Sequence, residues 1–199
     1  MREPTRDGYA AMASAASDVA KDLATAGAGV IAYACTVGSL SGGREGEVAL
    51  EISLAMAAGV PAISLADASM MALRAVGATR IAILTPYSAE TNAWVADYAT
   101  SRGFAVDAMI SMPVGIATVG DLSPAAVVAI AAEAMANCHE ADALWIPCTA
   151  VQTLDAIAAI EAVTRRPAIS GSQALLWRAL ALLGIEDPIR GAGRLFAER

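Results

Sequence analysis

The amino-acid sequence predicts an α/β fold made of two similar lobes, each a parallel sheet flanked by helices. First, short apolar runs of strand length alternate with helical stretches throughout the 199 residues. Second, the two runs at 29–36 and 143–149 both end in Cys-Thr. Third, Pro-Ala-Ile-Ser follows each run after a helical stretch, at 61–64 and 167–170, and each copy is followed by another helix. One strand–helix–strand–helix unit therefore occurs twice.

The first half begins with an expected helix over 7–25, where Asp7 can act as the N-cap. Apolar residues recur in it at three- and four-residue spacing, which gives the helix one face to bury. Gly27 and Gly29 end this helix before the first Cys run. The remaining elements are a loop, a helix, a strand and a helix, over 38–43, 44–58, 61–64 and 66–76.

The second half opens with an element that the first half lacks. Residues 79–84 predict a strand, and Thr85-Pro86-Tyr87 forms the loop at its carboxyl end. No counterpart precedes the helix at 7–25, so we expect the first lobe to lack its leading strand and to expose a sheet edge. We expect that the native protein begins upstream of Met1 or that a partner chain covers this edge. The other elements are helices at 88–101, from 123, at 151–163 and at 172–183, a strand at 104–110, a loop at 111–121 and a tail at 187–199.

Composition and charge exclude several classes of function. The net charge is −7 without a cluster of basic residues, which argues against nucleic acid and anionic membranes as partners. The polar opening predicts no signal peptide, and no apolar run is long enough to predict a membrane span. Three widely spaced cysteines without a CxxC pair predict neither a disulfide framework nor a zinc site, and the aspartates are too scattered for a metal cluster. These features favour a reducing, cytoplasmic compartment.

The repeated cysteines are the candidate catalytic residues. Cys35 and Cys148 follow strands, and the carboxyl ends of parallel strands are where α/β proteins form their sites. A thiol beside a helix N-terminus can have a lowered pKa and act as a nucleophile or base. An isolated cysteine is more often a small core residue, but two at matching places favour chemistry. Cys138 has no repeat partner and is expected to be structural, and nothing places His139 near either repeated thiol.

Three hydroxyl-bearing residues lie next to these thiols in the predicted fold. Thr36 and Thr149 each offer a hydroxyl and a backbone N–H, and Tyr87 ends a neighbouring strand. Together they could hold a carboxylate and the negative charge that develops on it during proton transfer. The threonines could equally serve as helix caps, and Tyr87 could be a packed aromatic. No GxGxxG or P-loop pattern accompanies the glycines at 38–43, so no nucleotide cofactor is predicted.

From Asp7 to the carboxyl end, the sequence resembles the aspartate/glutamate racemase superfamily, in its branch of maleate cis–trans isomerases and arylmalonate decarboxylases. The motifs that carry the resemblance are Cys35-Thr36, Thr85-Pro86-Tyr87, Gly115-Ile116, Cys148-Thr149, residues 153–157 and residues 193–196. The resemblance implies two pseudosymmetric lobes with the active site in the cleft between them. It also implies chemistry without a cofactor or a metal.

By position, the resemblance implies that Cys35 and Cys148 are the two catalytic residues. Arylmalonate decarboxylases have glycine at the place of Cys35, and their remaining cysteine, matching Cys148, protonates an enediolate. They also carry a serine at the place of Val37. The implied pocket for a carboxylate or enediolate consists of Thr36, Val37, Tyr87, the backbone N–H groups of Thr149 and Ala150, and Tyr9.

Because both thiols are present, we expect a cofactor-independent isomerase or racemase that acts on a small carboxylic acid. One alternative is a decarboxylase with Cys148 as proton donor, and another is an inactive relative that only binds carboxylates. We expect residues 1–78 to form the first lobe and residues 79–199 the second lobe with a tail, packed as one unit. A homo-oligomer is compatible with the sequence.

Overall fold

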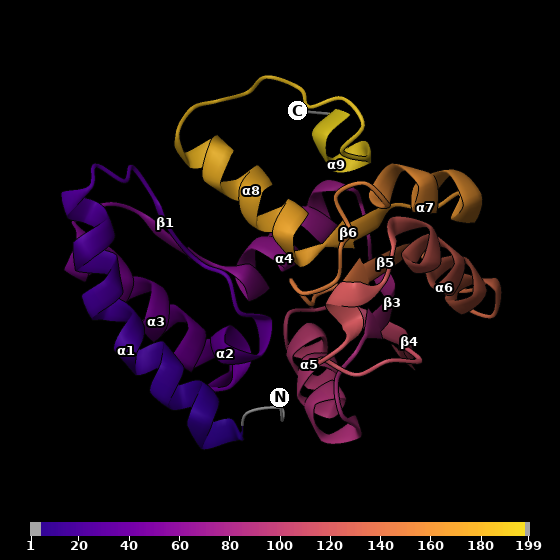
Figure 1. The fold of residues 1–199 in the computed structure, drawn as a ribbon, viewed down its shortest axis with the longest axis horizontal. Helices are drawn as coiled ribbons and strands as arrows, with labels where there is room; N and C mark the ends of the chain where they lie inside the picture. The colour runs from indigo at the N-terminus through magenta and orange to yellow at the C-terminus, as the bar shows by residue number, and fades with distance from the viewer. Residues whose placement is uncertain (1–4, 198–199) are drawn as a thin grey trace.

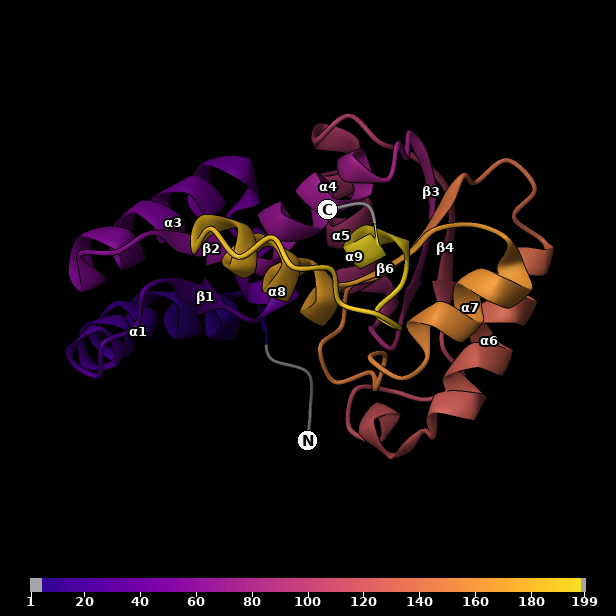
Figure 2. The same ribbon diagram turned by 90° about the horizontal axis from the view of Figure 1, so that it is seen from above.

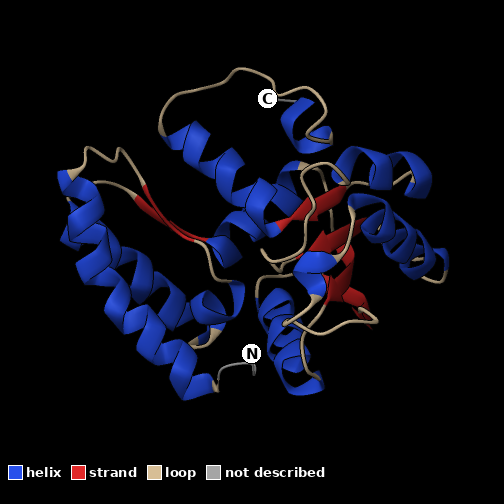
Figure 3. Cartoon of the chain, viewed as in Figure 1, coloured by secondary structure: helices blue, strands red, loops and turns tan. Residues whose placement is uncertain are grey.

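The computed structural model describes residues 5–197, and it contains two separate parallel sheets with helices around them (Figures 1 and 3). The first sheet has two strands and the second has four, in the order β4-β3-β5-β6. The α/β class predicted from the sequence is confirmed. The strands are β1 (Ile31–Tyr33), β2 (Ala62–Ser64), β3 (Arg80–Thr85), β4 (Ala105–Ser111), β5 (Ala143–Ile146) and β6 (Ala168–Ser170).

The two Cys strands pair in the same way with the two Ala-Ile-Ser strands. β1 lies parallel to β2 with Ile31 opposite Ala62, and β5 lies parallel to β6 with Leu144 opposite Ala168. The other edge of β5 is occupied by β3, whereas β1 pairs only with β2 among residues 5–197. The repeat read from the sequence is therefore a structural repeat, and its first copy has one unpaired edge at β1.

Helices of the first half surround the small sheet. Thr5, and not Asp7, caps the first helix, because its hydroxyl accepts the Gly8 N–H, while Asp7 lies within the first turn. A short helix follows Cys35 directly, where the sequence had indicated only a loop. The helices are α1 (Arg6–Thr25), α2 (Thr36–Leu40), α3 (Gly43–Ala58) and α4 (Leu65–Ala75).

Helices of the second half cover the larger sheet. Helix α8 packs along α4 between the two sheets, so the Ala-Ile-Ser strands of both halves lead into one central helix pair (Figures 1 and 2). The helix expected over 151–163 begins only at Ile157, because residues 149–156 form a loop around the second cysteine. The helices are α5 (Ala89–Ser101), α6 (Pro124–Ala136), α7 (Ile157–Thr164), α8 (Gly171–Leu182), α9 (Arg194–Ala197) and a 3₁₀ turn at Val119–Asp121.

The main core lies on the central strands of the larger sheet. Ile81, Ile83, Leu144 and Trp145 are fully buried there. A smaller cluster around Ile31 lies between α1, α3 and β1. Beside the unpaired edge of β1, side chains of α1 such as Met12 (48%), Val19 (57%) and Leu23 (48%) stay about half exposed and line an apolar groove.

A buried polar network joins α3, the start of α4 and α5. The Glu47 carboxylate accepts hydrogen bonds from the Ser64 hydroxyl at 2.7 Å and the Tyr98 hydroxyl at 2.6 Å. Arg102 forms ion pairs with Glu47, at 2.9 Å, and with Asp67. These contacts fix α5 of the second half against α3 of the first.

The boundary expected between the lobes, at residues 78 and 79, falls between α4 and β3. The assignment of 1–78 and 79–199 to separate lobes stays a prediction, and its outermost residues, 1–4 and 198–199, lie outside the described part of the chain. No helix within residues 5–197 is both long and apolar enough to cross a membrane.

Candidate active site

The first candidate thiol lies at the N-terminus of a short helix. Strand β1 ends at Tyr33, and Cys35 in extended conformation caps α2. Its Sγ accepts the Gly38 backbone N–H at 3.4 Å, which is the role that a serine or aspartate usually plays at an N-cap. Cys35 is half-buried, whereas Cys148 is buried.

The second thiol lies at the equivalent end of β5. Cys148 follows Pro147 and is buried. The Tyr87 hydroxyl and the backbone N–H groups of Ala150 and Val151 lower the pKa of this thiol. The Val151 N–H donates to the Cys148 carbonyl oxygen at 3.3 Å. The loop after β5 therefore turns back on the Cys148 residue, and α7 begins only after a turn in which Ala156 and Ile157 donate to the Thr153 carbonyl at 2.9 Å.

Two hydrogen-bonding residues tie the cysteine loops together. The buried Thr36 hydroxyl donates to the carbonyl oxygen of Pro147 at 2.6 Å, across 111 residues of sequence. The Tyr87 hydroxyl hydrogen-bonds with both Thr36 and Cys148. The ends of β1, β3 and β5 therefore meet, and the structure brings together Cys35, Thr36, Tyr87 and Cys148.

Tyr87 is itself held from β3 and α5. The Thr85 hydroxyl accepts the Tyr87 backbone N–H at 3.3 Å and is bonded to the Asn92 side chain. Asn92 in turn donates to the Tyr87 carbonyl at 3.5 Å and to the Ser111 hydroxyl at 3.2 Å. Sequence reasoning had singled out the Thr-Pro-Tyr loop but not Asn92, which lies one turn into α5 and has no motif of its own.

Burial raises the pKa of both thiols, contrary to the lowering expected from helix N-termini. For Cys35, desolvation outweighs the backbone N–H groups of Gly38 and Val37, which lower its pKa. For Cys148, desolvation outweighs the Tyr87 hydroxyl and two backbone N–H groups, and the charge of Cys35 raises its pKa further. Once one thiol has ionised, its charge therefore disfavours ionisation of the other.

The remaining predicted pocket residues are distributed around this centre. Val37 and Tyr9 are buried and belong to the main apolar core, while Thr149 and Ala150 are exposed on the loop after Cys148. The Thr36 hydroxyl donates its hydrogen bond to the Pro147 carbonyl oxygen, so it joins the two loops. Substrate-binding roles for these residues stay predictions.

Cys138 and His139 lie apart from the two thiols, as the sequence suggested. Cys138 is buried at the end of α6, where its thiol donates to the Ala134 carbonyl at 3.2 Å. The carbonyl of His139 accepts the Arg166 guanidinium at 3.2 Å. Across residues 5–197, no group of three or more His, Cys, Asp and Glu side chains could hold a metal ion.

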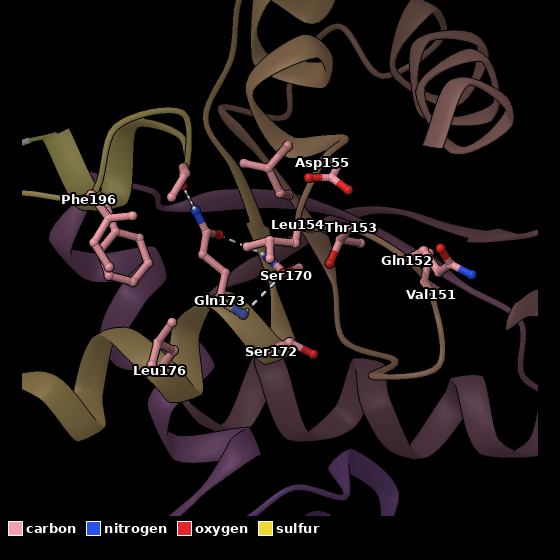
Figure 4. A pocket seen from close by; sticks show the side chains of 13 residues that line it. Val151, Gln152, Thr153, Leu154, Asp155, Ser170, Ser172, Gln173, Leu176 and Phe196 are labelled. Atoms are coloured by element: carbon pink, nitrogen blue, oxygen red, sulfur yellow. Dashed lines mark hydrogen bonds between the residues drawn. The ribbon is translucent and has the colours of Figure 1, made fainter. Parts of the chain in front are cut away.

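The loop that follows Cys148 lines a cavity of about 380 Å³ (Figure 4). Val151 to Asp155 line one side, and Gln173 and Leu176 of α8 with Phe196 of α9 line another. The Gln173 amide is already used, since it donates to the Ala192 carbonyl at 2.5 Å and accepts the Ser170 N–H at 3.2 Å. The cavity therefore depends on the C-terminal tail, which the sequence had left without structure.

Gly171 lies at a close contact between the two halves that sequence reasoning missed. A Cβ atom at Gly171 would lie within 3.0 Å of both the Pro147 carbonyl oxygen and a methyl carbon of Leu65. Leu65 and Gly171 follow the two Ala-Ile-Ser strands at equivalent places. The sequence signal that could have revealed this contact is the difference between the two copies of the repeat, which have leucine in the first half and glycine in the second. Where the two halves meet, only one of these positions has room for a side chain.

Comparison with known proteins identifies the family of the chain. The family model described as arylmalonate decarboxylase matches residues 1–196. An arylmalonate decarboxylase of Bordetella bronchiseptica is 29% identical over 196 residues, which cover 98% of this chain and 82% of that protein. A maleate isomerase of Pseudomonas putida is 30% identical over 205 residues, covering 99% and 81%. The structure of a Nocardia farcinica maleate cis–trans isomerase mutant with a covalently bound succinylcysteine intermediate superimposes with a TM-score of 0.90 at 27% identity, covering 100% of this chain and 83% of that one.

Proposed function

Since the chain belongs to the arylmalonate decarboxylase family, in the branch of the racemase superfamily that also contains maleate isomerases, we propose that it is a cofactor-independent isomerase or racemase of a small carboxylic acid. Its catalytic residues in this proposal are Cys35 and Cys148. The observation that carries it is the joining of the two cysteine loops by the Thr36 hydroxyl and the Pro147 carbonyl, at 2.6 Å. Neither thiol can be treated as an isolated core residue when their loops share a buried hydrogen bond.

As an isomerase, the protein uses one thiolate as a nucleophile. The sulfur adds to one alkene carbon of a maleate-like substrate, and the π electron pair moves into the adjacent carboxylate as an enediolate. The opposite thiol donates its proton to the second carbon, which leaves a thioether with a freely rotating carbon–carbon bond. After rotation, the second cysteine takes a proton back, the carbon–sulfur bond breaks, and the trans acid leaves.

As a racemase, the protein uses the same pair for proton transfer alone. One thiolate removes the proton from the α-carbon, the electron pair enters the carboxylate, and the opposite thiol donates a proton to the other face. Both versions need one thiolate and one thiol at the same time. The charge of Cys35 raises the pKa of Cys148, which keeps the second thiol protonated beside the first thiolate.

Hydrogen-bond donors near Cys148 would stabilise the enediolate. In this proposal the backbone N–H groups of Thr149 and Ala150, with the Tyr87 hydroxyl, receive the negative charge that develops beside this thiol; the influence of Tyr87 and Ala150 on the pKa of Cys148 supports their part in it. Thr36 joins the two loops in this proposal. It is also hydrogen-bonded to Tyr87, whose hydroxyl would contact the enediolate. Val37 and Tyr9 supply buried apolar wall in this proposal.

The nature of residues 35 and 37 favours isomerisation or racemisation over decarboxylation. A decarboxylase of this family resembles the present chain at Cys148 but carries glycine at position 35 and a serine at position 37. Here both side chains differ, because a second thiol is present and the hydroxyl is replaced by the buried apolar Val37. All three cysteines are free, so the proposed chemistry suits the reducing cytoplasm.

A substrate panel in deuterated water tests this function. The wild-type protein is incubated with maleate, an α-aryl malonate, a hydantoin and free amino acids, and products are followed by NMR and chiral chromatography. We expect fumarate from maleate, or racemisation with deuterium at the α-carbon. Carbon dioxide release from the aryl malonate alone would establish the decarboxylase instead, and binding without turnover would establish an inactive relative. The matched control is Cys138→Ser, whose thiol lies outside the site.

A further inference from the structure

The side chain of Tyr33 carries a buried hydroxyl whose function the proposed reaction leaves open. Tyr33 ends β1, two residues before Cys35, and its Oη is shielded from solvent without any hydrogen-bond partner. A buried hydroxyl without a partner costs free energy, so such groups in proteins usually serve a state in which a partner arrives. Among the side-chain atoms of residues 5–197, only this hydroxyl and the Trp145 indole N–H are in that condition.

The geometry around Gly38 places the Tyr33 hydroxyl beside the first thiol. A Cβ atom at Gly38 would lie 2.5 Å from Tyr33 Oη and 3.2 Å from Cys35 Sγ. The oxygen and the sulfur are therefore no farther apart than the sum of these two distances, with the open side of Gly38 between them. Because a larger residue at position 38 would fill that space, glycine keeps the hydroxyl and the thiol within reach of each other.

The repeat shows that this arrangement belongs to Cys35 alone. Tyr33 corresponds to Ile146 in the second half, so Cys148 has no hydroxyl at the equivalent place. Cys148 instead has the Tyr87 hydroxyl, which comes from the strand–loop element at 79–87. Among residues 5–197, the first half contains no counterpart of that element, so a tyrosine reaches each thiol by a different route.

We propose that Tyr33 is a positioning residue that donates a hydrogen bond to the thiolate form of Cys35. The inference rests on the proposed function, in which one of the two cysteines works as a thiolate. In the neutral form, the Sγ atom accepts the Gly38 N–H at 3.4 Å with the Val37 N–H beside it, and ionisation gives the sulfur further acceptor capacity toward the hydroxyl. A thiolate held from two sides keeps its orientation toward the substrate while the opposite thiol moves a proton.

The ionisation of the surrounding groups fits this role. Burial, together with the charge of Cys35, raises the pKa of Tyr33 to about 12, so the hydroxyl keeps its proton at neutral pH and remains a donor. The other titratable groups that sense the charge of Cys35 are Tyr87, from the end of β3, and Cys148, from the end of β5. Tyr87 is already hydrogen-bonded to Cys148 and Thr36, which leaves Tyr33 as the side-chain donor for Cys35.

The test measures the pKa of Cys35 directly in a protein that has no other thiol. Cys138→Ala and Cys148→Ser leave Cys35 alone, and the rate of its alkylation by iodoacetamide is followed from pH 6 to 11. Tyr33→Phe keeps the ring that packs in the groove beside α1, so the fold is expected to survive, and thermal unfolding checks this. We expect the substitution to raise the pKa of Cys35 by about one unit, with roughly tenfold slower alkylation below that pKa.

A second single-thiol protein separates this effect from a general disturbance. With Cys148 as the remaining thiol, Tyr33→Phe is expected to leave the alkylation profile unchanged. A folded Tyr33→Phe protein in which Cys35 titrates as before, or in which both thiols shift equally, overturns the inference. The readout does not depend on turnover. If no substrate is converted but the Cys35 profile shifts, the proposed function fails and the role of Tyr33 stands.

Discussion

Replacing Gly171 by alanine tests whether the close contact between the two halves sets the position of Cys148. The new Cβ would lie 2.8 Å from Leu65 Cδ2 and even closer to the carbonyl oxygen of Pro147, whereas real Cβ contacts essentially never fall below 3.0 Å. Leucine can rotate, but the carbonyl belongs to the backbone that carries Cys148. That backbone must therefore retreat by roughly half an ångström.

The displaced carbonyl is the acceptor of the Thr36 hydroxyl, so two losses combine. Overpacking costs about 1–3 kcal/mol, and weakening the 2.6 Å hydrogen bond adds about 1 kcal/mol. Up to about 1 kcal/mol is regained because alanine suits a helix better than glycine. We expect a net loss of about 2 kcal/mol and a fall in Tm of about 4–8 °C. Turnover should fall on the order of tenfold, since the thiol moves by a fraction of an ångström.

The assay compares Gly171→Ala with Gly46→Ala, a matched substitution inside α3. A Cβ at Gly46 meets no atom within 4 Å outside its own helix turn, so this control should be as stable as wild type or slightly more stable. Thermal unfolding and kcat/KM are measured for both. If Gly171→Ala behaves like Gly46→Ala in both measurements, the tight contact does not position the Cys148 loop and the reasoning is refuted.

Three further outcomes follow from the site and the polar network. Because burial raises the pKa of both thiols, the thiolate fraction at pH 7 is small and grows with pH. The value of kcat/KM should therefore still rise between pH 7 and about 9, and a plateau by pH 7 contradicts this. Tyr87→Phe removes a donor that lowers the pKa of Cys148, so it should shift the pH profile of kcat/KM toward higher pH. It should also lower kcat/KM at pH 7.5 by about 10–100-fold, and a pH profile that superimposes on that of the wild type argues against the role of Tyr87. Arg102→Met leaves the buried Glu47 carboxylate without its ion pair and should lower the free energy of unfolding in urea by about 3–5 kcal/mol. Adding Glu47→Gln should restore part of that stability, and a loss below about 1 kcal/mol in Arg102→Met would show that the network is not coupled.

Elements with a strong local pattern could be predicted from the sequence. The strand expected at 79–84 is β3, because its apolar run is buried on both faces, and the helix expected at 88–101 is α5, capped by Ser88. The internal repeat also placed both cysteines correctly, because equivalent strands must end at equivalent edges of their sheets. Local patterns sufficed wherever the apolar spacing and the capping residue lie within one element.

Features that depend on distant contacts could not be predicted. The loop before α7 folds back on Cys148, where the Val151 N–H donates to the Cys148 carbonyl at 3.3 Å, and no helix propensity includes such a contact. Helix α2 is short and glycine-containing, and it forms because Cys35 caps it and its residues are buried. The bond from Thr36 to Pro147 joins residues 111 positions apart. The thiol pKa was expected in the wrong direction because the helix terminus was considered without desolvation.

Serine substitution of each cysteine is the most direct test of the central claim that two thiols act on one substrate. Cys35→Ser, Cys148→Ser and Cys138→Ser are compared on the substrate that the panel identifies, with circular dichroism and Tm to confirm folding. We predict that Cys35→Ser and Cys148→Ser each lower kcat by on the order of a thousandfold or more, while Cys138→Ser stays near wild type. Retained activity in a folded Cys35→Ser protein, with decarboxylation kept or gained in Cys35→Gly, would contradict the two-thiol account and leave Cys148 as the sole proton donor.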